Sequence, residues 1–159
     1  MSDLTHVDAA GAARMVDVTG KDVTSRVATA TGVMRTTAEV VELLASNGLK
    51  KGDALAVARV AGIMGAKRTS DLVPLCHPLP ISGVTVDFSL DGSDVAITAT
   101  VRTSGQTGVE MEALTAVTVA GLTLHDMIKA VDPAAVLSEV RLERKEGGKS
   151  EVWTRPEGR

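Results

Sequence analysis

The stretch VTVDFSLDGSDVAITATV, residues 84–101, decides the fold, because apolar and polar side chains alternate on both sides of a turn signal. Successive side chains of a β-strand point to opposite faces, so each half of the stretch has one apolar and one polar face. Between the halves, Asp91-Gly92 is typical of a tight hairpin turn. The sequence therefore predicts an antiparallel hairpin that is covered on one face only. The apolar positions are Val84, Val86, Phe88, Leu90, Val95, Ile97, Ala99 and Val101.

Helical periodicity dominates on both sides of this hairpin. Asp53 predicts a helix N-cap, Asn47-Gly48 a left-handed helix end, and Asp132-Pro133 a helix stop. Helices are predicted over residues 37–46, 54–68 and 109–131, and strands over residues 15–18, 27–37 and 136–143, with room for one more strand after Gly147-Gly148. This order predicts a ferredoxin-like α+β fold, an antiparallel sheet covered by helices.

The chain has 159 residues, which is enough for one domain. We expect a flexible N-terminal arm over residues 1–14, a single domain over residues 15–152 and a C-terminal tail over residues 153–159. The opening of the sequence is polar and rich in Gly and Ala, which is why the arm is expected to be mobile.

Composition excludes several classes of function. The formal net charge is −3 and the aromatic content 1%, so neither a basic surface nor aromatic stacking favours nucleic-acid binding. Cys76 is the single cysteine, which excludes a disulfide framework within one chain and favours a cytoplasmic location. The longest charge-free apolar stretch, residues 113–124, is shorter than the about 20 residues that a bilayer requires. We therefore expect no nucleic-acid partner and no membrane association.

The same stretch predicts an oligomer. Residues 113–124 hold no charged side chain, so the predicted long helix has no clear water-facing side. A helix that is apolar all round is buried all round, and a two-layer domain of this size cannot cover both sides alone. A homo-oligomer with helices at the subunit contact is the simplest solution.

Polar groups bracket this apolar helix. Asp126 and Lys129 near its end are three residues apart, so they share one helical face. They form either a surface ion pair or a lysine that a carboxylate holds at a cleft. Glu110 and Glu112 at its start either interact favourably with the positive end of the helix dipole or accept hydrogen bonds from amino and imino groups of a purine or pterin ring.

The proline-rich loop LVPLCHPLP offers Cys76 and His77. Adjacent residues do not make an ordinary zinc site, so we predict no metal centre, and His77 is the better binding candidate. No P-loop is present, so phosphate groups would need scattered cations. These are Lys50, Lys51, Lys67, Arg68, Lys129, Arg144, Lys145 and Lys149, of which the segment RKEGGKS, residues 144–150, is the best anion candidate.

Three segments resemble one family. KKGDALAVARVAGIMGAKRTSDLVPLCHPLPISGV (residues 50–84), TGVEMEALTAVTVAGLTLHDMIKAVD (107–132) and VRLERKEGGKS (140–150) are similar to the MoaC family of cyclic pyranopterin monophosphate synthases. The resemblance implies a ferredoxin-like fold and a homo-hexamer, a trimer of dimers, with an active site shared by two subunits. It also implies a GTP-derived substrate that a radical-SAM partner enzyme supplies, (8S)-3′,8-cyclo-7,8-dihydroguanosine 5′-triphosphate, which becomes cyclic pyranopterin monophosphate plus pyrophosphate in molybdenum cofactor biosynthesis.

The resemblance also implies roles for individual residues. Lys51, Asp126 and Lys129 match catalytic positions, and we expect Lys129 to act as general acid, Lys51 as general base and Asp126 to hold Lys129. The residues expected to bind substrate are Leu75, Cys76, His77, Glu110, Met111, Glu112 and Lys145, and Lys67 would help Lys145 with the triphosphate. No cofactor is expected, although a magnesium ion with the triphosphate is compatible with this scheme. The alternative is a non-catalytic nucleotide- or pterin-binding oligomer of the same fold.

Overall fold

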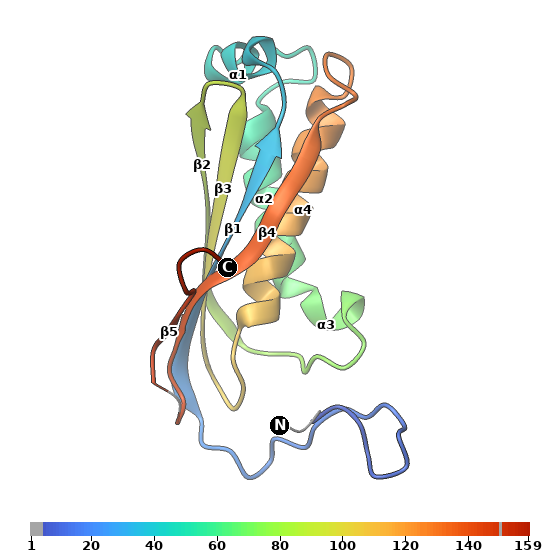
Figure 1. Cartoon of the computed structure of the whole chain (residues 1–159), viewed down its shortest axis with the longest axis vertical. Coiled ribbons are helices and arrows are strands. Elements are labelled where there is room, and N and C mark those ends of the chain that lie inside the picture. Colours follow the sequence, from blue (N-terminus) through green and yellow to red (C-terminus); the bar gives the residue numbers. More distant parts are fainter. Residues whose placement is uncertain (1–4, 150) are drawn as a thin grey trace.

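The computed structural model describes residues 5–149 and 151–159 and shows a five-stranded sheet with helices against one face (Figure 1). The N-terminal residues 1–4 of the expected arm and Ser150 of the segment 144–150 lie outside the described residues. The strands are β1 (Thr24–Arg35), β2 (Ile81–Asp91), β3 (Asp94–Gly105), β4 (Val136–Glu146) and β5 (Trp153–Thr154). The helices are α1 (Ala38–Ala45), α2 (Ala54–Lys67), α3 (Thr69–Leu72) and α4 (Glu110–Ile128).

The sheet has the order β2-β3-β1-β4-β5, and every neighbouring pair is antiparallel. Along the chain, β1 is followed by the helices α1–α3, the hairpin β2–β3, the helix α4 and then β4. This β-α-β-β-α-β order is the ferredoxin-like arrangement that the sequence predicts. The predicted hairpin is confirmed as β2 and β3, with Asp91 opposite Asp94 and Gly92 at a φ of +60° in the turn. Such a φ is costly for residues with a side chain, which explains the glycine.

Two predicted helix-end signals are confirmed, whereas α4 ends at Ile128, before the predicted residue 131. Asp53 caps α2 through the amide of Ala56. At the start of α1, the side chain of Thr37 accepts a hydrogen bond from the amide of Val40. Asn47 lies at a φ of +54° after α1, in the left-handed conformation expected for a helix end. One predicted element is wrong, because residues 15–18 form no strand. Alternation marks a segment that can extend, but a strand also needs a partner, and in the described structure the sheet edges are β2 and β5.

The core lies between the sheet and the α2–α4 layer. Six side chains of α4 are fully buried in the core: Ala113, Ala116, Val117, Ala120, Leu124 and Ile128. Small residues bring α2 against α4, since a Cβ on Gly62 would lie 2.9 Å from the carbonyl oxygen of Ala116. The opposite side of this layer is open within one chain, because Leu122 on α4 is 68% exposed and Met64 on α2 is 56% exposed. No helix within the described residues is long and apolar enough to cross a membrane.

β4 is longer than predicted and reaches Glu146. β1 and β4 pair with register shifts on either side of Ala30 and Thr31, and Glu139 in β4 adopts a φ of +52°. Such irregularities accentuate local twist. Beyond β4, Trp153 of the expected tail pairs with Lys145, and the tail therefore adds the short edge strand β5.

Candidate active site at the two ends of the long helix

The C-terminal end of α4 carries an ion-pair cluster. Asp126 Oδ1 lies 2.7 Å from Lys129 Nζ, and Asp126 Oδ2 lies 3.1 Å from Lys51 Nζ. Lys51 also donates to the backbone carbonyl of Asp126 at 2.8 Å. Hydrogen bonds from Lys129 and then from Lys51 hold the pKa of Asp126 below its usual value. One carboxylate therefore holds both candidate lysines of the same chain.

This cluster is open to solvent. The side chains of Lys51, Asp126 and Lys129 are 44%, 56% and 54% exposed. Lys129 is the C-cap of α4, where a cation is favoured by the helix dipole, and Lys51 comes from the turn between α1 and α2. Water at this exposure weakens charge interactions, so an isolated chain gives these groups little of the desolvation that acid–base catalysis uses.

The N-terminal end of α4 carries a cavity of about 190 Å³. The loop after α3 supplies one wall, and the first turn of α4 supplies the other. Six of the predicted substrate-binding residues line this cavity together: Leu75, Cys76, His77, Glu110, Met111 and Glu112. A seventh, Lys67, lines a smaller adjoining hollow with His77 and Glu112.

Glu112 is the buried carboxyl group of this cavity. Its residue is only 4% exposed, and burial, with a smaller contribution from Glu110, raises its pKa to about 7. Burial also raises the pKa of the Cys76 thiol, again with contributions from Glu112 and Glu110. A raised pKa favours the neutral thiol and disfavours Cys76 as a nucleophile. The cavity therefore combines one buried carboxyl group with hydrogen-bonding groups that are partly exposed to water.

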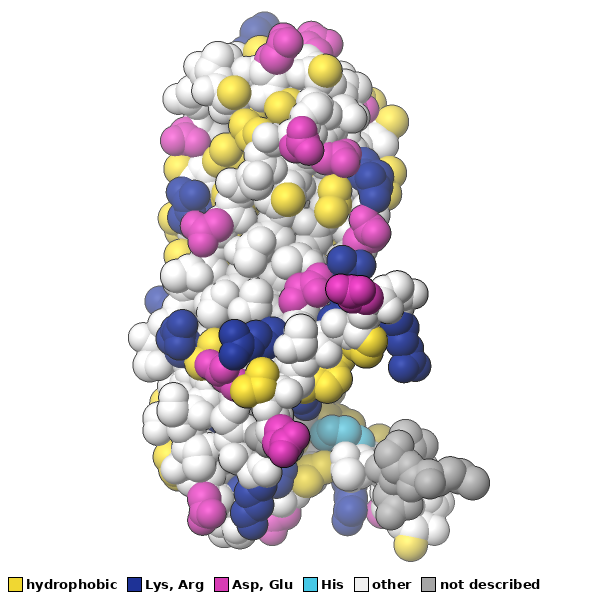
Figure 2. Space-filling view, turned by 60° about the vertical axis from the view of Figure 1, so that its left-hand side comes forward, with side chains coloured by type: hydrophobic (Ala, Val, Ile, Leu, Met, Phe, Trp, Pro, Cys, Tyr) yellow, Lys and Arg dark blue, Asp and Glu magenta, His cyan; other side chains and the backbone are white. Residues whose placement is uncertain are grey.

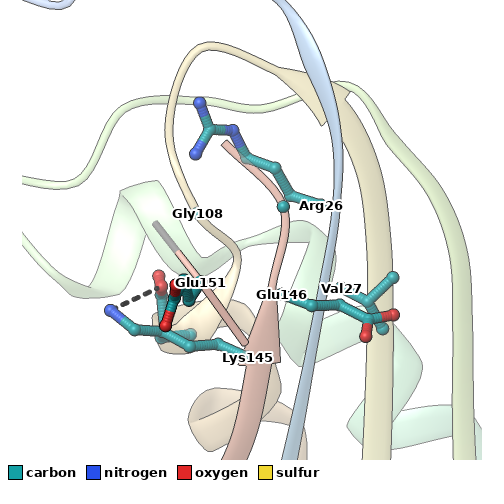
Figure 3. A pocket seen from close by; sticks show the side chains of 8 residues that line it. Arg26, Val27, Gly108, Lys145, Glu146 and Glu151 are labelled. Atoms are coloured by element: carbon teal, nitrogen blue, oxygen red, sulfur yellow. Dashed lines mark ion pairs between the residues drawn. The ribbon is translucent and has the colours of Figure 1, made fainter. Parts of the chain in front are cut away.

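The eighth predicted binding residue, Lys145, joins this end of the molecule from β4. Its Nζ lies 3.5 Å from Glu110 Oε1 (Figure 3). Lys145 and Glu110 line a pocket with Arg26, whose guanidinium donates to the backbone carbonyls of Gly105 and Gln106 at 3.0 and 3.3 Å. The pocket therefore has a fixed guanidinium on one side and an ammonium group on the other.

Beside this pocket lies a hollow of about 320 Å³ lined by three cations, Lys21, Arg26 and Lys149. Lys21 and Arg26 were not predicted from the sequence, because neither belongs to a recognisable motif. The signal available was their position at the start of the first long strand: Lys21 precedes β1 and Arg26 lies among its first residues, and β1 pairs antiparallel with β4, in which the segment 144–150 begins. Glycines permit this close approach, since a Cβ on Gly147 would collide with the carbonyl oxygen of Ser25 and one on Gly148 with the guanidinium of Arg26.

The two ends of α4 do not meet within one chain. Glu112 and Asp126 lie on the same straight helix, so a rise of 1.5 Å per residue separates them by about 21 Å. A general acid or base must lie within about 3 Å of the atom whose proton it transfers. The eight predicted binding residues thus gather at one end, and the three predicted catalytic residues gather at the other. Within the described ranges 5–149 and 151–159, no group of three or more His, Cys, Asp or Glu residues could hold a metal ion.

Comparison with known proteins gives one consistent result. Residues 15–148 match the MoaC family. A protein from Streptomyces coelicolor named cyclic pyranopterin monophosphate synthase is 66% identical over 152 residues, covering 96% of this chain and 89% of the relative. A relative of the same name from a Nocardioides species is 63% identical and covers 96% of both chains. Cyclic pyranopterin monophosphate synthase 2 of Mycobacterium tuberculosis is 61% identical and covers 96% of this chain and 92% of the relative. The match spans both ends of α4 and nearly every element of the sheet, and the chain belongs to the MoaC family.

Proposed function

We propose that the chain is a cyclic pyranopterin monophosphate synthase that acts on (8S)-3′,8-cyclo-7,8-dihydroguanosine 5′-triphosphate. Membership of the MoaC family makes it an enzyme of molybdenum cofactor biosynthesis, of the lyase type. The substrate and the acid–base role of the lysines are the parts that we propose. The observation that carries the proposal is the division of the site between a buried cavity and an exposed lysine cluster at opposite ends of α4.

The cavity supports a purine-derived ring. Glu110 and Glu112 provide carboxyl oxygens that accept hydrogen bonds from ring N–H and amino groups, and His77 lies beside them. Leu75, Cys76 and Met111 supply apolar contact with the ring. A buried group that forms a hydrogen bond only with the right ring discriminates strongly, because any other ring leaves that group unpaired.

The cations beside the cavity support a triphosphate. Lys145 and Lys67 adjoin the ring cavity, and Arg26, Lys21 and Lys149 lie farther from it. Carboxylates line the same hollows, namely Glu110, Glu146, Glu151 and Asp22, so the cations alternate with acidic groups. The cations would hold the β- and γ-phosphates and stabilise the negative charge that develops on departing pyrophosphate. No step in this scheme requires a redox cofactor, and a magnesium ion would enter only as a companion of the triphosphate.

The lysine cluster supports proton transfer. Closing the cyclic phosphate joins a hydroxyl oxygen to the α-phosphorus and breaks the bond from that phosphorus to the oxygen that bridges it to the β-phosphate. We assign Lys51 as the base that accepts protons and Lys129 as the acid that delivers them to the opening ring. Asp126 holds the two side-chain nitrogens at fixed positions, 3.1 and 2.7 Å from its two oxygens. Lys51 accepts a proton in its neutral amine form, whereas Lys129 donates one from its ammonium form.

A second copy must complete the site, because about 21 Å of helix separates the lysine cluster from Glu112 in one chain. The exposed apolar residues of α2 and α4, among them Val57, Val60, Met64 and Leu122, support association of copies. We propose the homo-hexamer, a trimer of dimers, as the assembly. We also propose that a radical-SAM GTP cyclase supplies the substrate and that the enzyme works in the cytoplasm.

Subunit mixing tests this arrangement. Lys129→Ala and Glu112→Ala chains are each expected to be inactive alone. Dissociated and reassembled at equal amounts, they should regain about a quarter of wild-type turnover, because half of the randomly formed pairs are mixed and each mixed pair contains one intact site of two. A mixture of Lys51→Ala and Lys129→Ala chains is the control and should regain nothing, since one Asp126 holds both lysines of a chain.

Two outcomes would contradict the proposal. Recovery in the Lys51→Ala and Lys129→Ala mixture would show that the lysines serve different sites. Binding of the cyclised dihydro-GTP by wild-type chain without any turnover would instead identify a non-catalytic nucleotide- or pterin-binding module.

A further inference from the structure

The described chain before β1, residues 5–23, reaches the ring cavity; it includes the expected arm and its continuation to β1, and is called the arm below. His6 lines this cavity together with Cys76, His77 and Thr107. The arm leaves the start of β1 and runs outward below α3 (Figure 1), and histidine surface is visible where the arm meets the body (Figure 2). Among the residues that line the cavity, His6 is the one that lies far from the others in sequence, and no role is predicted for it from the sequence.

The arm holds His6 in a closed loop. The amide of Arg14 donates to the carbonyl of His6 at 2.9 Å, and Val7 forms an antiparallel bridge with Ala13. Inside the loop, Asp8 Oδ1 accepts hydrogen bonds from the amides two and four residues later, both at 2.9 Å. Gly11 completes the turn at a φ of +82°. Residues 6–14 therefore form a preorganised loop with His6 at its end.

A second set of contacts ties the arm to the cavity wall. Gln106 Nε2 donates to the backbone carbonyls of Thr19 and Lys21, at 3.4 and 3.2 Å. Gln106 directly precedes Thr107 and Gly108, which line the cavity. In the same segment, hydrogen bonds from Thr19 lower the pKa of Asp17. The base of the arm and the wall of the cavity therefore share one anchor.

The hydrogen bonding of the His6 ring determines what it can offer a ligand. Its Nδ1 lies 3.3 Å from the carbonyl oxygen of Arg14, and a carbonyl oxygen can only accept. Nδ1 therefore carries the proton, and Nε2 of the neutral ring is left as a hydrogen-bond acceptor. This adds an acceptor to those of Glu110 and Glu112 on the other walls.

We propose that His6 is a ring-binding residue, whose Nε2 accepts a hydrogen bond from an N–H group of the purine-derived ring while the loop 6–14 covers the open side of the cavity. The inference rests on the proposed function for the identity of the ring, but it does not depend on the roles of the lysines. Asp8 and Gln106 act through His6 and are positioning residues.

Calorimetric titration of the assembled protein with GTP tests the proposal. His6→Ala should raise the Kd for GTP about fivefold, as expected for the loss of one neutral hydrogen bond. His6→Gln retains a side-chain acceptor and should stay within about twofold of wild type, and so should Ala10→Ser, a substitution in the same loop outside the cavity lining. Inorganic tripolyphosphate, which has no ring, should bind wild type and His6→Ala equally. Hydrogen exchange should show slower exchange of amides in residues 6–14 when GTP is bound.

The outcomes separate this inference from the proposed function. Suppose that Glu112→Ala abolishes GTP binding, that His6→Ala binds GTP like wild type, and that GTP does not slow amide exchange in residues 6–14. The ring cavity is then supported and the role of His6 is wrong. An equal loss of tripolyphosphate binding in His6→Ala would also overturn that role. If wild-type chain binds tripolyphosphate but not GTP, both the ring cavity and the role of His6 are wrong.

Discussion

The two ends of α4 differ in their contact with water. At the N-terminal end, the residue Glu112 is 4% exposed, inside a cavity of about 190 Å³. At the C-terminal end, Lys51, Asp126 and Lys129 are 44–56% exposed, and they contact one another more than the body of the protein. In the proposed function, the first end binds the ring and the second end supplies the groups that transfer protons, and only the first end has a buried carboxyl group.

This difference shows how a short chain can form an active site of this kind. Recognition through hydrogen bonds needs desolvated groups, which one chain provides by packing a loop onto the start of α4. Proton transfer needs the same desolvation, but at the other end of α4 only the inner face is buried, with Leu124 and Ile128, and the side chains of the lysine cluster stay exposed. A second copy that seats its cavity against the lysine cluster would provide the missing wall and the ring together.

The largest expected effect comes from removing the shared carboxylate. Asp126→Ala leaves Lys51 and Lys129 without their common acceptor, so kcat for formation of cyclic pyranopterin monophosphate should fall by about 10²–10⁴. The Kd for GTP should stay within about twofold, because Glu112 and its cavity are unchanged. Glu42→Ala removes an exposed carboxylate of α1 and is the matched control. Near wild-type turnover of Asp126→Ala would break the assignment of chemistry to this end.

The segment between the two ends is expected to matter for stability. In Gly62→Ala the new Cβ would lie 2.9 Å from the carbonyl oxygen of Ala116 and 3.1 Å from the Cβ of Ala120. This overlap outweighs the gain of about 1 kcal/mol in helix propensity, so the free energy of unfolding should fall by about 1–2 kcal/mol. Denaturant titration measures the change, and Gly20→Ala, where no atom lies within 4 Å of the new Cβ, is the control. An unchanged free energy would mean that α2 can shift away from α4 at no cost.

The buried carboxyl group predicts a pH effect at the N-terminal end alone. The pKa of Glu112 is raised from 4.5 to about 7, so its contribution favours the folded state below pH 4.5 and is lost as pH rises through 7. The side chain of Glu112→Gln cannot ionise, so this variant should not show the loss. Between pH 5 and pH 8, its free energy of unfolding should therefore rise by roughly 1 kcal/mol relative to that of wild type, a value that is reduced for the partial solvation of the site. Denaturant titrations at the two pH values measure it, with Glu42→Gln as control. If wild type and Glu112→Gln show the same pH dependence, Glu112 is ionised throughout and the contrast between the two ends is weaker.

The smallest effect is expected from Lys67→Ala. Lys67 is exposed and only adjoins the ring cavity, so its removal should raise the Kd for GTP about two- to threefold at low salt, and less at high salt. Calorimetry at two salt concentrations checks this, and Lys50→Ala removes a similar charge outside the cavity. A tenfold rise in the Kd for GTP would contradict this prediction and would make Lys67 a main binding residue of the site.

Much of the fold and of the site could be predicted, for separable reasons. Alternation in residues 84–101 predicted the hairpin because its turn and pairing are local. The same signal failed at residues 15–18, where no strand of the sheet is available as a partner. The proposed binding residues were named through a resemblance to a family, whereas Arg26, Lys21 and His6 were missed because their places in the lining of the hollows depend on contacts with segments distant in sequence.

The sequence by itself determined the elements of this protein, the apolar character of the middle of α4 and the identity of the charged groups at its ends. Those properties depend on neighbours a few residues apart, through periodicity, caps and turns. Only the tertiary structure decided that Glu112 is buried while Asp126 is exposed, that one Asp126 holds both lysines, and that about 21 Å of helix separates these two groups of side chains. Burial and distance depend on which segments pack together. In this fold the loop after α3 lies over Glu112, whereas Asp126 lies on the outer face of the other helix end.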